Sequence, residues 1–226
     1  MFWALVLCHF IADYPLQTDG IVRAKRSLSG LSLHIAIHLL TKIAVIIGLL
    51  RISWQDSLPT ILAVVACHFA IDYWKNVLMR LRPQWIIFGY IQDQALHILS
   101  ILLIAYWNVQ SSAAGLFDVG SPAVIYATGY ILVTQTWFIT ERLFVYRFKD
   151  YEAWVDQQRW PRMMSRAAIY SIPLIGWNMG GLAALGAALL VRVYDLQGRY
   201  RWISLLLDVA GVAFFIGLGQ LILAVW

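Results

Sequence analysis

Seven stretches of this chain consist mainly of apolar residues, and each is roughly 20 residues long, the length that crosses the hydrocarbon core of a bilayer as a helix. Charged residues make up 13% of the sequence, about half the share of a typical soluble domain. The sequence therefore predicts an all-α fold, a polytopic transmembrane helical bundle with six or seven spans. The segments lie at about 1–17, 31–50, 57–79, 86–109, 121–146, 167–191 and 202–226.

Lysine and arginine residues are distributed unevenly over the connections between these segments. They are concentrated after the first, third and fifth segments and are sparse after the second and fourth. Because cytoplasmic loops carry an excess of positive charge, this pattern predicts a multi-pass protein of the cell (inner, cytoplasmic) membrane with its amino terminus outside. The net charge of +5 has the same explanation, so we expect the lipid bilayer as partner and no nucleic acid.

The end of the chain breaks this alternation. Arg192, Arg199 and Arg201 follow the sixth segment, where alternation would place them outside. That segment contains Pro173 and several glycines, so a broken or re-entrant helix could return these arginines to the cytoplasm. Six and seven spans are therefore both compatible with the sequence.

A basic and aromatic stretch covers residues 147–166, in a predicted cytoplasmic loop. It could form an amphipathic helix on the anionic inner leaflet, or an ordinary charged loop. Two acidic residues lie in apolar segments of the same half of the chain. We expect Glu141 to pair locally with Arg142 or to be solvated at the interface, and the sequence gives no partner for Asp208.

All five histidines lie in the first 97 residues, and each is four residues from another histidine or from an aspartate. Residues at this spacing project from one face of a helix, so each pair points in one direction. The pairs are His9–Asp13, His34–His38, His68–Asp72 and Asp93–His97.

The same pattern occurs twice along the chain, because each member of the first two pairs has a counterpart 59 residues later. We therefore predict that residues 1–109 form a core built by tandem duplication of a two-helix unit, with parallel repeats at about 1–56 and 57–109. Residues 110–226 would then form a variable region of three segments that includes the basic loop 147–166.

If the four helix faces converge, the side chains form two layers about one helical turn, or ~6 Å, apart. The outer layer would hold His9, His38, His68 and His97, and the inner layer Asp13, His34, Asp72 and Asp93. Ionisable groups inside a bilayer are costly unless they are paired or solvated, so we predict a functional site here.

These eight side chains are candidate ligands for one or two divalent transition-metal ions such as Zn, Fe or Mn. Asp13, Asp72 and Asp93 are also candidate catalytic groups, because a carboxylate can act as general base beside a metal-activated water. Neighbouring polar residues could support the ligands or contact substrate, namely Gln17, Asp19, Lys75, Asn76 and Gln94.

The ordered motifs CHFIADYPLQTD, LHIAIH, CHFAIDYWKN and QDQALH resemble those of an uncharacterised bacterial membrane family, catalogued as domain of unknown function 3307. The resemblance covers about residues 1–107 and implies no activity by itself. The His/Asp pattern of the family is similar to that of membrane-bound metal-dependent hydrolases, and this similarity favours hydrolysis.

The sequence thus favours a metal-dependent membrane hydrolase that acts on a lipid or lipid-linked ester or phosphoester. Two alternatives stay open: a metal-ion or proton-coupled transporter or channel, and a membrane scaffold or sensor in which the histidines and aspartates only join helices. No serine-hydrolase elbow, phosphate-binding loop or H-E-x-x-H motif occurs in the sequence.

Overall fold

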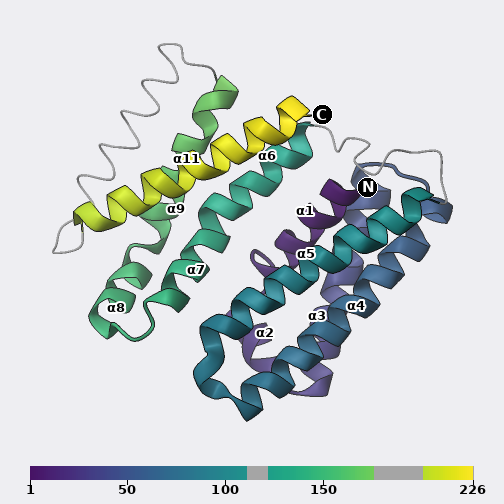
Figure 1. Ribbon diagram of the computed structural model, residues 1–226, viewed down its shortest axis with the longest axis horizontal. Helices are drawn as coiled ribbons and strands as arrows, with labels where there is room; N and C mark the ends of the chain where they lie inside the picture. Colours follow the sequence, from purple (N-terminus) through teal and green to yellow (C-terminus); the bar gives the residue numbers. More distant parts are fainter. Residues whose placement is uncertain (111–121, 176–200, 226) are drawn as a thin grey trace. The chain divides into compact units, whose positions relative to one another are not determined.

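The structure is a computed structural model that describes residues 1–110, 122–175 and 201–225. These residues form helices and no strand. Contacts divide the chain into two compact units, Met1–Ile125 and Tyr126–Trp226. Figure 1 traces both, and each is described by itself below.

The described residues of the first unit up to Gln110 form a bundle of four principal helices. They are α1 (Phe2–Asp13), α3 (Leu28–Lys42, continued by the π-helix Ile43–Leu49), α4 (Trp54–Leu81) and α5 (Ile86–Gln110). The short helices α2 (Asp19–Ala24) and Pro83–Trp85 lie in the connections. Helix α1 contacts α3 and α5, and α4 contacts the same two helices, so the four surround a common interior.

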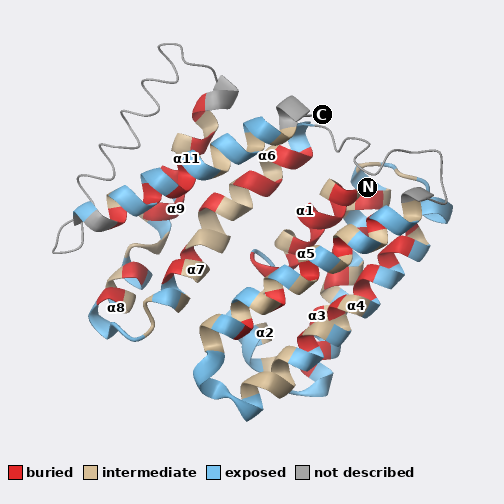
Figure 2. Cartoon of the chain, viewed as in Figure 1, coloured by how far each residue is buried: buried red, intermediate tan, exposed pale blue. Residues whose placement is uncertain are grey.

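Apolar side chains fill one end of this interior. They come from the first half of α1, the π-helix after α3, the first half of α4 and the second half of α5, and include Leu5, Ile46, Ile61 and Ile101. Figure 2 shows α1 mostly in the colour of buried residues, because the three longer helices cover it. The polar site lies along the same helices, next to this apolar core.

Helix α1 is shorter than the predicted segment at 1–17. It ends at Asp13, because Pro15 restricts the backbone of Tyr14 and has no N–H to continue the ladder. Twelve residues give about 18 Å of helix, less than the ~30 Å hydrocarbon core. The described residues include five helices long and apolar enough to cross a membrane, with α1 as an additional shorter apolar helix.

The corner between α2 and α3 brings two backbones close together. Ser27 caps α3 by accepting a hydrogen bond from the backbone N–H of Gly30 at 3.1 Å. A Cβ atom on Gly30 would lie 2.1 Å from the carbonyl oxygen of Ala24, so only glycine fits. This corner fixes the start of α3 beside Lys25, which contributes to the site.

In its described residues, the second unit contains most of a long apolar helix that begins at Pro122, followed by three further helices. The long helix is formed by α6 (Pro122–Ile131), a π-helical turn (Leu132–Thr136) and α7 (Trp137–Phe144). It is followed by α8 (Lys149–Gln157), α9 (Arg159–Ile175) and α11 (Arg201–Val225). The stretch 147–166 is therefore mainly helical and not an irregular loop.

Part of the predicted sixth segment lies outside the described residues. Helix α9 includes Pro173 and extends to Ile175, but residues 176–191, together with Arg192 and Arg199, are not described. The choice between six and seven spans, and the re-entrant alternative, stay predictions.

Candidate metal centre

The eight histidines and aspartates predicted as ligands meet inside the first unit. Each of α1, α3, α4 and α5 contributes one pair, and the i, i+4 spacing turns both members of a pair toward the interior. None of the eight is more than 5% exposed, namely His9, Asp13, His34, His38, His68, Asp72, Asp93 and His97.

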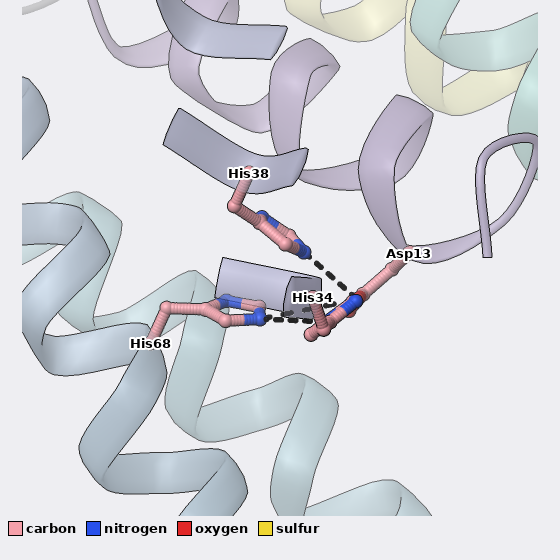
Figure 3. Close-up of side chains that lie close together, drawn as sticks. All are labelled: Asp13, His34, His38 and His68. Carbon is pink, nitrogen blue, oxygen red and sulfur yellow. Dashed lines mark hydrogen bonds and ion pairs between the residues drawn. The ribbon is translucent and has the colours of Figure 1, made fainter. Parts of the chain in front are cut away.

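Three imidazoles surround the carboxylate of Asp13, as Figure 3 shows. Asp13 Oδ1 lies 3.0 Å from His38 Nε2, 3.1 Å from His34 Nε2 and 3.9 Å from His68 Nε2. The Nε2 atoms of His34 and His68 are themselves 3.3 Å apart. Side chains from three helices therefore direct their potential ligand atoms at one point.

Two further groups continue from this one. His9, His68 and His97 form the first, and Asp72, Asp93 and His97 the second; within each group the ligand atoms lie within 4.8 Å of one another. The ring of His68 lies 3.7 Å from that of His38 and 3.9 Å from that of His97, measured between centroids. The three groups thus share residues and form one continuous cluster.

Lysines distinguish the three carboxylates. Lys25 Nζ lies 2.9 Å from Asp72 Oδ2, and Lys75 Nζ lies 2.6 Å from Asp93 Oδ2. All ion pairs of Asp13 within the described residues are with histidines. Because no lysine neutralises Asp13, the group around it is the best candidate for a cation.

A third lysine, Lys42, lies fully buried next to this group. Its Nζ is 3.2 Å from His38 Nδ1, on the side of the ring opposite Asp13. The sequence analysis singled out neither Lys42 nor Lys25 as a site residue. The spacing His34–His38–Lys42 continues the i, i+4 series and was the available signal for Lys42.

Four of the five predicted supporting residues border the cluster. Gln17 donates to the backbone oxygen of Asp13 at 2.8 Å and accepts from Lys25 at 2.9 Å. Gln94 donates to Asp93 Oδ2 at 3.2 Å, and its Oε1 lies 3.4 Å from His9 Nε2. Lys75 pairs with Asp93 as described, and Asn76 donates to the backbone oxygen of Lys25 at 2.8 Å.

The fifth, Asp19, lies exposed in the first turn of α2 and forms no hydrogen bond or ion pair within the described residues. The structure instead adds two tyrosines that the sequence analysis missed. The hydroxyls of Tyr14 and Tyr90 lie 2.8 Å apart, and Tyr14 also donates to Gln94 Oε1 at 3.3 Å.

The residues around Asp13 fit a divalent transition metal. Imidazole nitrogen and carboxylate oxygen are ligands that Zn, Fe and Mn accept. Neighbouring ligand atoms of a tetrahedral zinc ion are about 3.3 Å apart, given bonds of ~2.0–2.1 Å. Among Asp13, His34 and His68, two of the three distances, 3.1 and 3.3 Å, are close to that value, and the third is 3.9 Å. The buried Nδ1 atom of His34, in the same group, forms no hydrogen bond within the described residues.

The second unit contains a separate buried ionic cluster. Arg162 Nη2 lies 2.6 Å from Glu141 Oε2 and 2.8 Å from Asp208 Oδ1, and Arg166 Nη2 contacts the same two oxygens at 3.2 and 2.6 Å. The expected pairing or solvation of Glu141 at the interface was thus wrong, because α9 approaches α7 and supplies two arginines. Arg142 pairs instead with Glu152 and Asp156.

Tyr151 completes this ionic cluster by donating to Glu141 Oε1 at 2.9 Å. Burial, followed by the neighbouring Glu141 carboxylate, raises the pKa of the Tyr151 hydroxyl well above its ordinary value. This hydroxyl therefore stays a hydrogen-bond donor at neutral pH.

The apolar helices and the buried histidine and aspartate groups define a helical membrane protein with an internal site that could hold a metal ion. The chain belongs to the family described as Protein of unknown function (DUF3307), whose model matches residues 1–121. The match includes all eight clustered residues. Comparison with curated proteins and with solved structures gave no match.

Proposed function

We propose that this protein is a metal-dependent hydrolase of the bacterial inner membrane that cleaves an ester or phosphoester of a lipid or lipid-linked substrate. The observation that carries the proposal is the convergence of Asp13, His34, His38 and His68, whose potential ligand atoms lie within 4.8 Å of one another. One divalent ion at this group is the simplest occupancy.

The residues of the cluster divide into two roles in this proposal. Asp13 and imidazoles of the surrounding group would hold the ion, which would act as a Lewis acid and lower the pKa of a water molecule. Asp72 or Asp93 would accept the proton of the attacking water, and Asp72 is adjacent to the Asp13 group, with its Oδ2 3.4 Å from His68 Nε2. His97 Nε2 lies 3.7 Å from Asp72 Oδ1 and 3.4 Å from Asp93 Oδ1 and would position both carboxylates.

Two features support access of an anionic group and of water to the cluster. Lys75 is the most exposed of the three site lysines, with 29% of its side chain accessible, so it can pair with an anionic headgroup. A small hollow between α4 and α5 lies beside the Lys75–Asp93 pair, and Gln92 lines it together with apolar residues such as Ile71 and Leu78. It has room for about one water molecule, so it gives water a place next to Asp93.

The basic connections of the first unit support cytoplasmic access. Asn76 and Arg80, near the end of α4, donate to the backbone oxygens of Lys25 and Arg26, which lie between α2 and α3. Both predicted cytoplasmic loops therefore lie at one end of the unit, with the inner layer of the site closest to them. By the positive-inside rule, that end faces the inner leaflet and the amino terminus lies outside.

The direct test is hydrolysis by detergent-purified protein loaded with Zn, Mn or Fe, measured on a panel of lipid esters and phosphoesters. Asp13→Asn should lower the rate of hydrolysis by about 100-fold or more. Asp19→Asn, a matched change at an exposed aspartate, should leave the rate unchanged. Metal-loaded protein that cleaves none of these substrates would count against the proposal.

Ion transport is the second candidate, and a specific observation favours it. The three donor groups share His68 and His97, so they form a continuous series of potential ligands from Asp13 to Asp93 through the bundle interior. Uptake of Zn²⁺ or Mn²⁺ into proteoliposomes, abolished by Asp93→Asn, would support transport over hydrolysis.

A further inference from the structure

Lys42 occupies an unusual position for a lysine. Its side chain is fully buried in α3, one helical turn beyond His38, and it forms no ion pair within the described residues. Its hydrogen bond is to the ring of His38, with Nζ 3.2 Å from Nδ1. Burial of a lysine is costly, so a functional reason for its presence is expected.

Hydrogen-bond chemistry gives this contact a direction. A lysine side chain offers donors to its neighbours, so Nδ1 of His38 is the acceptor. A neutral imidazole carries one N–H, which must then be on Nε2. His38 Nε2 lies 3.0 Å from Asp13 Oδ1, so it donates to this carboxylate. The direction of donation is therefore Lys42 to His38 to Asp13.

We propose that Lys42 is a positioning residue that holds His38 in the Nε2–H tautomer and thereby keeps this histidine from binding the metal. A nitrogen that carries a proton has no lone pair for an ion, so His38 orients Asp13 from outside the ligand set. The ligands that remain in the group are Asp13, His34 and His68. This inference rests on the metal site of the proposed function.

The number of ligands decides what the ion can do. Four protein ligands are typical of structural zinc sites, whereas three ligands and a free position are typical of catalytic ones. Because Lys42 keeps His38 from binding the ion, one coordination position stays free for water or substrate. Lys42 thus serves the reaction although it contacts neither the ion nor the substrate.

The second half of the bundle lacks this arrangement. The residue 59 positions after Lys42 is Ile101, which is buried in the apolar core. The corresponding histidine, His97, has a buried Nδ1 atom with no hydrogen bond within the described residues. Ile101 is therefore a matched control position, because its buried side chain can be changed without altering the contacts between Lys42, His38 and Asp13.

X-ray absorption spectroscopy of the zinc-loaded, detergent-purified protein tests the inference by counting the imidazoles on the metal. Wild type should show two histidine ligands, and Lys42→Met should show three, with zinc bound at least as tightly. Two histidine ligands should remain in three control variants. In His38→Gln the glutamine still donates to Asp13, in Lys42→Gln the glutamine still donates to His38 Nδ1, and Ile101→Met leaves these contacts unchanged. Three histidines in wild type that fall to two in His38→Gln would overturn the proposal.

A second readout does not depend on the metal. In metal-free protein labelled with ¹⁵N-histidine, His38 should show the Nε2–H tautomer in wild type and lose this preference in Lys42→Met. If wild type binds no zinc, the proposed function fails, and this measurement still decides the role of Lys42. A tautomer that is the same in wild type and Lys42→Met would overturn the inference. If Lys42→Met does not fold, the comparison of the histidine ligand count in wild type and in His38→Gln decides it.

Discussion

At the scale of single residues, the site is organised by how each buried carboxylate is neutralised. Asp72 and Asp93 are paired with Lys25 and Lys75, while Asp13 is surrounded by imidazoles. A buried ion pair costs desolvation of both partners, and removal of one partner leaves an uncompensated charge. The lysines are therefore needed for a stable cluster whether or not a metal is bound.

Lys75→Met should lower the free energy of unfolding by about 2–3 kcal/mol, somewhat less than is typical for a fully buried pair, because part of this side chain is accessible. Lys149→Met is the matched control, since Lys149 forms an exposed pair with Glu152 that should contribute at most ~0.5 kcal/mol. Thermal unfolding in detergent measures both. Equal stability of the two variants would show that the Lys75–Asp93 pair is not structurally important.

At the scale of elements, periodicity identified the helices and the faces that carry the site, because the i, i+4 spacing and the 59-residue offset can be seen directly in the sequence. It did not identify partners that lie outside the repeated histidine and aspartate pattern. Helix α1 ends before Pro15, whereas the apolar segment predicted at 1–17 continues past this proline. Glu141 meets Arg162 and Arg166 only when α9 approaches α7, and a pattern along one helix does not encode this approach.

Helix α9 shows the same limitation more clearly. Arg162 and Arg166 are buried inside the second unit, whereas Trp160 and Met164 are 66% and 69% exposed. A basic stretch suggests a polar outer face, but here the charges point inward and apolar side chains point outward. This orientation suits a helix in contact with lipid, and the two carboxylates on α7 and α11 make it possible.

Asp208→Asn should destabilise the second unit by about 3–5 kcal/mol, because it removes the carboxylate that both buried arginines share. Asp150→Asn, at an exposed position in α8, should change stability by less than ~0.5 kcal/mol. Protease resistance and thermal unfolding in detergent distinguish the two. An Asp208→Asn protein as stable as wild type would mean that the arginines find other partners.

At the scale of the whole molecule, the candidate site and the second buried ionic cluster belong to different units. The family match ends at residue 121, close to the end of the first unit at Ile125. The eight clustered residues therefore lie in the part of the chain that the family model describes. We expect the first unit to supply the chemistry and the rest of the chain to supply functions particular to this protein.

The orientation of the protein is testable by labelling single cysteines introduced in place of Arg26 and Gln55, in a Cys67→Ala background. An impermeant maleimide should label position 55 in intact spheroplasts and position 26 only after lysis, because the basic connection lies inside. Cys8 is fully buried and serves as an internal negative control. The opposite labelling pattern would place the amino terminus in the cytoplasm and the access side of the site outside.

The central claim is that the histidines and aspartates of the first unit hold a metal ion, and metal content tests it most directly. Elemental mass spectrometry of protein purified in detergent with supplemented metals should find about one equivalent of Zn, Fe or Mn in wild type. A His34→Ala/His68→Ala double variant that remains folded should contain none. A folded, metal-free wild-type protein would contradict the claim and leave the cluster as a polar core or a proton pathway.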